Sequence, residues 1–102
     1  MGASYAREKL AGAVHALAVG TGTIQERLVD AFISMVALSE SDFTGDRLDE
    51  WQSVYAKATA REPEGDEGRF KATILRLNDD DASNLARDIV NLEAMMDLDR
   101  EY

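Results

Sequence analysis

The chain has 102 residues, of which 45% are hydrophobic and 30% are charged, and it contains one proline and no cysteine. This composition predicts one globular domain and excludes disulfide bonds, cysteine nucleophiles and cysteine-ligated metal clusters. The formal net charge of −9 argues against direct binding to nucleic acid or to anionic membranes, because their phosphate groups would repel the protein.

The first predicted helix runs from a Ser4 cap to the residue before Gly20. Apolar side chains recur there at steps of three and four residues, which is the spacing of one helix face: Tyr5, Leu10, Val14, Leu17 and Ala18. Gly20 and Gly22 then favour a left-handed helix end and a tight link. We therefore expect two consecutive helices joined by a short turn.

A second helix is predicted from Thr23 to Leu38. Thr23 and Glu26 match a capping box, in which each side chain accepts a hydrogen bond from the backbone N–H of the other residue. Apolar residues occupy more than one face of this helix, so it needs burial on most of its sides. Either it is the central helix of a bundle, or a second copy of the chain covers one face. The residues that a partner could contact are Val29, Ile33 and Val36.

A polar connection and a third helix follow. Within residues 39–45, Phe43 is expected to contact the core. Trp51 and Tyr55 belong to the apolar stripe of the third helix, which predicts that both lie in the core rather than on a binding surface. A loop is predicted over residues 62–68, which contain the only proline, two glycines and four acids.

The last third of the chain predicts a short helix and a long one. Residues 70–77 fit either a short helix or an extended segment, and we expect a helix because no other segment offers a strand to pair with it. Asn78 is the expected cap of the last helix, followed by Asp79 to Asp81 in the first turn, where the helix dipole favours negative charge. The inward stripe of this helix comprises Ala82, Leu85, Ala86, Ile89, Leu92, Glu93 and Met96. The expected fold class is therefore all-α, a single-domain bundle over residues 1–102 with four main helices plus one short helix.

Residue patterns for catalysis, cofactors and metals are weak throughout the chain. The only histidine, His15, has no second ligand at helical spacing, so we expect a half-buried, hydrogen-bonded structural histidine rather than a catalytic one. The acids Asp79 to Asp81 lack the glycine and glutamate of an EF-hand loop, and helix capping explains them better. We predict no catalytic, cofactor-binding or metal-binding residue.

The charge is distributed unevenly along the chain. Residues 1–38 contain equal numbers of basic and acidic side chains, whereas residues 39–102 carry the whole net charge of −9. One interpretation is that the neutral part forms the core or an oligomer contact and that the acidic part is solvated. The other is that an acidic face, including Asp66 and Glu67, engages a basic partner. Met95 could add an adaptable contact, since thioethers repack easily.

Several short segments resemble a family of small bacterial proteins of unknown function. The residues that carry the resemblance are helix caps and loop residues, namely Gly22 to Leu28, Asp42 and Phe43, Gly65 to Gly68, Asn78 to Ala82, and Ile89 and Val90. The resemblance covers the chain from about Leu10 to Leu98. It implies a bacterial, intracellular, all-helical protein and carries over no active site.

Three functions are compatible with these features. The first is a non-enzymatic adaptor or regulatory module that binds a protein partner, or a second copy as a homodimer, through apolar helix faces and an acidic surface. The second is an acidic decoy that occupies the nucleic-acid site of a basic protein. The third is a small-ligand binder or enzyme that uses His15. The short apolar stretches and the start of the chain predict a cytoplasmic location, with neither membrane association nor direct nucleic-acid binding.

Overall fold

The helices of the protein follow the periodicity and the capping residues of its sequence. The computed structural model describes residues 2–61 and 68–99, which form five α-helices and one 3-10 turn. They are α1 (Gly2–Val19), α2 (Ile24–Met35), the 3-10 turn η1 (Glu40–Asp42), α3 (Gly45–Ala58), α4 (Arg69–Ile74) and α5 (Asp79–Asp99). No strand occurs within these two ranges. The prediction of an all-α bundle with four long helices and one short one is confirmed.

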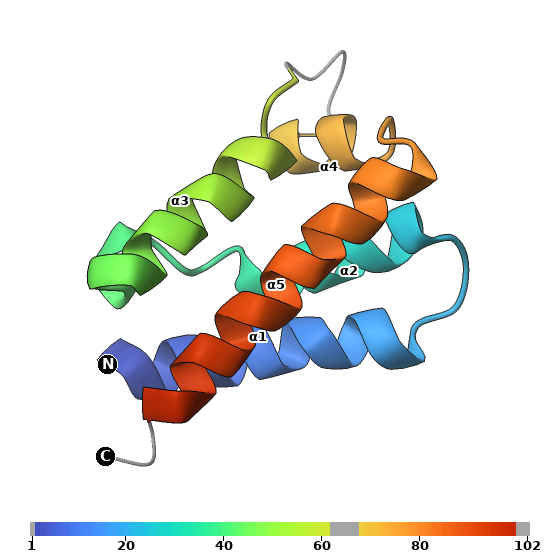
Figure 1. The fold of residues 1–102 in the computed structure, drawn as a ribbon. Helices are drawn as coiled ribbons and strands as arrows, with labels where there is room; N and C mark the ends of the chain where they lie inside the picture. Colours follow the sequence, from blue (N-terminus) through green and yellow to red (C-terminus); the bar gives the residue numbers. More distant parts are fainter. Residues whose placement is uncertain (1, 62–67, 100–102) are drawn as a thin grey trace.

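The long C-terminal helix organises the bundle. Figure 1 shows α5 lying diagonally across α1 and α2, while α4 sits at the far end of α3. The contacts agree with this view, because α5 packs against α1, α2 and α3, and α4 packs against α2 and α3. The first and last helices are therefore neighbours, and the short α4 closes one end of the bundle.

One continuous core joins all five helices. Its members come from every helix and from the connection after α2, and Leu10, Leu28, Ile74, Ile89 and Leu92 are fully buried. Phe43 is buried as expected, and its ring stacks on that of Trp51 with the centroids 5.1 Å apart. The stripe predicted for the last helix is buried or half-buried at all seven positions, so the direction of α5 is set by that stripe.

The link between α1 and α2 confirms the predicted capping box. The Glu26 N–H donates to Thr23 Oγ1 at 3.1 Å, and the Thr23 N–H donates to Glu26 Oε1 at 2.8 Å. Gly22, which precedes the cap, has a φ of +95°, a conformation that glycine adopts without strain. The expected left-handed residue is therefore Gly22, whereas the Gly20 N–H still bonds to the Ala16 carbonyl at 3.0 Å.

Three helix ends differ from the sequence prediction. α1 begins at Gly2 rather than at a Ser4 cap, because the buried Ala6 holds the first turn against the core. α2 ends at Met35 rather than Leu38, because the chain turns there, with the Leu38 N–H bonded to the Met35 carbonyl, and buries the Leu38 side chain. α4 likewise ends at Ile74 and continues as a turn to Leu77. Of the predicted loop at 62–68, only Gly68 belongs to the described residues.

The two ends of the α4–α5 connection are fixed by side-chain amides. Asn78 caps α5 as predicted, since its Oδ1 accepts the Asp81 N–H at 2.8 Å. The Gln25 amide group, in the first turn of α2, donates to the Leu77 carbonyl at 2.9 Å and to Asp79 Oδ1 at 3.0 Å. The beginnings of α2 and α5 are thereby tied together.

Replacing Thr23 with alanine is expected to lower the free energy of unfolding by about 0.5–2 kcal/mol, because the Glu26 N–H loses its acceptor at an exposed helix start. Urea denaturation followed by circular dichroism measures this change. A matched control is Thr21→Ala, which changes an exposed threonine of the same link that lies outside the capping box. Equal effects of the two substitutions would contradict the assignment of the cap.

The same capping box predicts a dependence on pH. Hydrogen bonds from Thr23 lower the pKa of Glu26 below its ordinary value. A carboxyl group whose pKa is lower in the folded protein than in the unfolded chain stabilises the fold at pH values above its ordinary pKa. This stabilisation is lost as the pH falls through the folded-state pKa. We expect Glu26→Gln to be less stable than the wild type at neutral pH, and the difference to disappear in acid. A difference that stayed constant with pH would contradict the role of the carboxylate.

Candidate interaction surface

The outer side of α2 exposes large apolar side chains. Ile33 is 58% exposed and Val36 is 70% exposed, while Val29 is half-buried. These three residues, which we call the α2 outer stripe, are spaced by four and three positions and therefore lie on one helix face. The inner side of the helix is buried through Leu28, Ala31, Phe32 and Met35. The neighbours α1, α4 and α5 cover the other sides of α2 and leave this face open, so the chain by itself does not enclose α2 as a central helix. The alternative, that a second copy covers this face, stays a prediction.

An apolar groove adjoins the C-terminal end of the outer stripe. It has a volume of about 290 Å³ and is lined by Phe32, Met35, Val36, Trp51, Tyr55, Thr59, Gly68, Arg69 and Phe70. Two ring contacts shape its walls: Trp51 with Tyr55 at a centroid distance of 5.6 Å, and Phe32 with Phe70 at 6.0 Å. We call this the aromatic groove.

Tyr55 does not lie in the core as predicted. Its side chain is 52% exposed, whereas Trp51, one turn earlier on the same helix, is buried. The ring of Tyr55 lines the aromatic groove together with Gly68, Arg69 and Phe70 of the α4 segment. Trp51 fulfils the prediction, and Tyr55 adds an aromatic surface that the stripe alone did not indicate.

A second hollow adjoins the N-terminal end of the outer stripe. It is lined by Thr21, Glu26, Val29, Asp30, Lys71 and Leu75, and the Leu75 side chain, just after α4, is 42% exposed. The hollow and the aromatic groove both combine residues of α2 with residues of the α4 segment. We define the α2–α4 face as the outer stripe together with Tyr55, Phe70 and Leu75.

Charges of both signs border the α2–α4 face. Glu26 and Asp30 lie beside Val29 and share their hollow with Lys71, while Arg69 lines the aromatic groove with Val36. Among the described residues, two acids and two bases thus flank the apolar side chains. This balance contrasts with the net charge of −9 of the chain.

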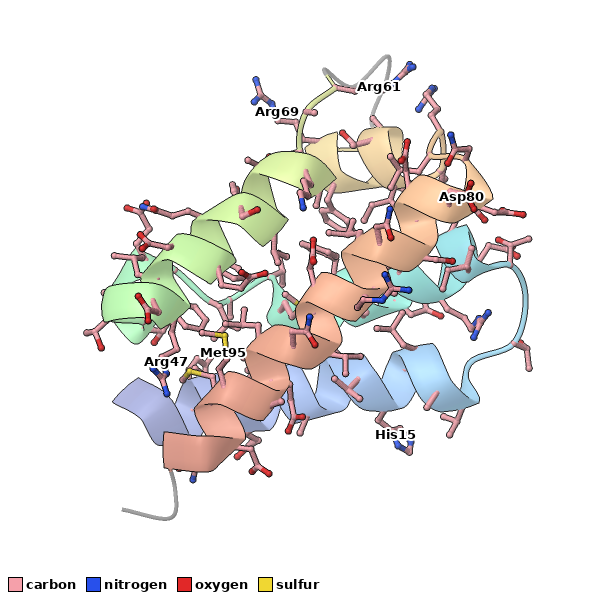
Figure 2. The ribbon with its side chains drawn as sticks, in the orientation of Figure 1. His15, Arg47, Arg61, Arg69, Asp80 and Met95 are labelled. Atoms are coloured by element: carbon pink, nitrogen blue, oxygen red, sulfur yellow. The ribbon has the colours of Figure 1, made fainter. Side chains whose placement is uncertain are left out.

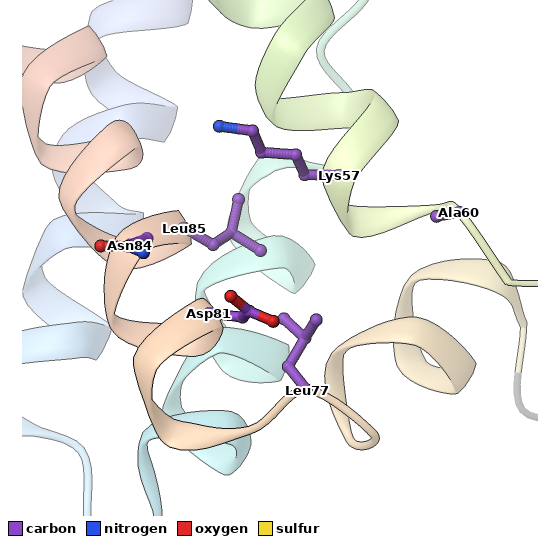
Figure 3. Close-up of a pocket in the computed structure, with 6 residues that line it drawn as sticks. All are labelled: Lys57, Ala60, Leu77, Asp81, Asn84 and Leu85. Atoms are coloured by element: carbon purple, nitrogen blue, oxygen red, sulfur yellow. The ribbon is translucent and has the colours of Figure 1, made fainter.

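A larger pocket lies between the end of α3 and the beginning of α5. Its volume is about 380 Å³, and Lys57, Ala60, Leu77, Asp81, Asn84 and Leu85 line it. Figure 3 shows Lys57 extending from α3 toward α5, with Leu85 pointing from α5 into the space between them and Leu77 beside Asp81 at the start of α5. Lys57 Nζ forms a salt bridge with Asp88 Oδ2 at 2.8 Å.

The salt bridge determines what Lys57 can do in this pocket. The hydrogen bond that Lys57 donates to the Asp88 carboxylate raises the pKa of Lys57 above its ordinary value. A lysine that acts as a nucleophile or general base needs a lowered pKa, so that the neutral amine is present near pH 7. Lys57 instead remains a cation that joins α3 to α5, and we assign it a structural role.

Among the other residues proposed for interaction, Met95 is described by the structure and does not line the α2–α4 face. Met95 belongs to α5 and is half-buried rather than exposed, and its carbonyl accepts a hydrogen bond from Arg47 Nη2 at 3.3 Å. Figure 2 shows Met95 and Arg47 together, away from Arg61 and Arg69 at the opposite end of the bundle. Asp66 and Glu67 lie outside the described residues.

His15 is exposed, so the prediction of a half-buried structural histidine is wrong. Its side chain points outward from α1, away from the bundle (Figure 2). The cause is helical geometry: Ala13 and Leu17 face the core, and His15, two positions from each, falls on the opposite side.

The acids at the start of α5 act at the helix terminus. Asp79 accepts the hydrogen bond from Gln25, and Asp80 and Asp81 are exposed in the first turn, where Figure 2 places Asp80 at the end of the bundle.

Within the described parts of the chain, no cluster of three or more His, Cys, Asp or Glu side chains could hold a metal ion. None of the helices described there combines the length and apolar character that crossing a bilayer would require.

The α2–α4 face contains residues that sequence reasoning found and residues that it missed. Val29, Ile33 and Val36 were expected to meet a partner, because a helix with two apolar sides needs a second covering element. Leu75 was missed, because nothing in the sequence indicates that the segment after α4 runs beside α2.

Comparison with protein-family models, with curated proteins and with solved structures gave no match.

Proposed function

We propose that the protein is a non-enzymatic interaction module, an adaptor or regulator, that binds another protein surface through its α2–α4 face. The observation that carries this proposal is the exposure of Ile33 and Val36 on one stripe of a helix whose opposite side is fully packed. Covering apolar side chains removes them from water and contributes about 25 cal/mol for each Å² buried. A contiguous set of such residues beside a groove is the arrangement in which interface energy concentrates.

The shape of the face supports a protein partner. The aromatic groove and the second hollow stand at the two ends of the outer stripe, so a partner can insert side chains at both ends and lie along α2 between them. The rings of Tyr55 and Phe70 supply large contact areas with few rotatable bonds, which keeps the entropy cost of binding low.

The acidic surface supports selectivity. Residues 39–102 carry the net negative charge, and these charges repel nucleic acids and other anionic surfaces that could compete for the apolar face. In this arrangement the apolar face supplies the affinity and the remaining surface excludes unsuitable partners.

Capture of partners by a tagged full-length chain tests the proposal. We expect Ile33→Asp to lose proteins that the wild type captures from its native host, with a reduction of about tenfold or more, because a buried unpaired carboxylate costs over 1.4 kcal/mol at an interface. Quantitative mass spectrometry of the captured proteins gives the ratio.

A matched control is Val19→Asp. Val19 is 61% exposed, and both Val19 and Ile33 lie in the last turn of a helix, so each aspartate meets the same unfavourable helix dipole. Circular dichroism verifies that both variants are folded. Capture of the same proteins at the same level by all three chains would contradict the proposal.

A further inference from the structure

We propose that the pocket between α3 and α5 binds a small organic cation, an amine whose ammonium group faces Asp81 and whose apolar body lies against Leu77 and Leu85. The volume of the pocket, about 380 Å³, falls within the range of about 300–1,000 Å³ that small-molecule sites occupy. The pocket shares no lining residue with the α2–α4 face, so this inference is independent of the proposed function.

The walls of the pocket are largely apolar. The Leu85 side chain is only 2% exposed, Leu77 is half-buried in the link before α5, and Ala60 adds a single methyl group after the end of α3. Lys57 extends across the gap toward α5, so its methylene stem adds a fourth apolar surface (Figure 3). A ligand with an apolar body therefore leaves water for contact with carbon atoms on several sides.

The two charged side chains that line the pocket differ in their partners. Lys57 Nζ lies 2.8 Å from Asp88 Oδ2, so this cation is already neutralised. The Asp81 backbone N–H donates to Asn78, but no side chain among the described residues pairs with the Asp81 carboxylate. Figure 3 shows this carboxylate beside Leu77. An ammonium group can therefore bond to Asp81 without breaking an existing contact, and its apolar body then reaches Leu77.

The surrounding charges select a cation over an anion. Over residues 79–89, α5 carries four carboxylates and one guanidinium, that of Arg87, and α3 adds the ammonium group of Lys57. The start of α5 contributes about half a positive charge, which the three carboxylates of its first turn outweigh. The pocket thus lies in a negative region of a chain whose net charge is −9, and an anionic ligand of the same shape is repelled.

NMR titration of the isotope-labelled full-length chain with phenethylamine tests the site. We expect a dissociation constant of about 1 mM, with the largest changes of amide shifts at Lys57, Ala60, Leu77 and Leu85. Phenethyl alcohol has the same shape without the charge and should bind about tenfold more weakly, and the anion hydrocinnamate should bind more weakly still. Amide shifts that do not change at these residues, or tighter binding of hydrocinnamate, would overturn the proposal.

Asp81→Asn tests the contact with the ammonium group. It should weaken the binding of phenethylamine by about tenfold and change that of phenethyl alcohol by less than about twofold. The matched control is Asp80→Asn, which removes the same charge from the same helix turn at a residue that does not line the pocket. Equal losses for the two variants would show a general attraction to the start of α5 and would overturn the assignment to Asp81.

Ala60→Phe fills the pocket without changing a charge. Ala60 is exposed after the end of α3, so we expect the variant to fold, which circular dichroism verifies, and to lose the binding of both phenethylamine and phenethyl alcohol. Undiminished binding would place the ligand elsewhere and overturn the proposal. None of these variants changes the α2–α4 face, so partner capture should persist in all of them, and a failure of amine binding leaves the proposed function intact.

Discussion

Replacing Ile89 with alanine is expected to lower the free energy of unfolding by about 2–5 kcal/mol. The Ile89 side chain is fully buried on α5, the helix that contacts α1, α2 and α3, so its loss leaves a cavity at the meeting point of several elements. Close packing prevents the neighbours from filling that space completely. Urea denaturation, followed by circular dichroism and by the fluorescence of the single tryptophan, measures the change.

The adjacent residue supplies the control for this substitution. Val90 follows Ile89 on the same helix, but its side chain is 42% exposed. Val90→Ala removes less buried surface and replaces a β-branched residue with a better helix former, so we expect a change of less than about 1 kcal/mol. A larger loss for Val90→Ala than for Ile89→Ala would show that α5 is rotated relative to the arrangement described above.

Replacing Trp51 with alanine is expected to cost about 3–5 kcal/mol. The indole is buried and contacts two rings, with centroid distances of 5.1 Å to Phe43 and 5.6 Å to Tyr55. Its removal eliminates both ring contacts and the wall between the core and the aromatic groove. Circular dichroism must follow the unfolding, because this variant has lost the only tryptophan.

Tyr55→Ala tests the half-exposed ring of this cluster, for comparison with the buried ring of Trp51. Tyr55 lies one turn after Trp51, and half of its side chain is exposed, so its truncation should cost about 1 kcal/mol of stability, much less than that of Trp51. Under the proposed function the same substitution should weaken partner capture. Equal losses of stability for both variants would contradict the different burial of the two rings.

The local elements could be predicted because their signals lie within a few residues. The Thr23 and Glu26 capping box, the Asn78 cap and the apolar stripe of α5 each specify a helix start or a helix face without reference to the remainder of the chain. The errors at Ser4 and Leu38 have the opposite origin. There the buried residues Ala6 and Leu38 decide where the helix begins or ends, and their burial depends on segments distant in sequence.

The candidate surface could be predicted only in part for the same reason. The apolar positions of α2 indicate that it has two sides to cover, but they do not indicate which side the chain itself covers. That choice depends on where α4 packs, and α4 is one short helix whose own sequence was ambiguous. The aromatic groove combines Phe32, Trp51 and Phe70 from three helices, so no sequence window contains it.

The amide of Gln25 has a consequence for the order in which the protein assembles. Its acceptors, Leu77 and Asp79, follow it by 52 and 54 residues. During synthesis α1 and α2 can associate as soon as they leave the ribosome, but the first turn of α2 acquires these acceptors only after the start of α5 has emerged. The start of α2 therefore has only its local capping box until the 54 residues after Gln25 have been made, and the arrival of α5 supplies the distant acceptors.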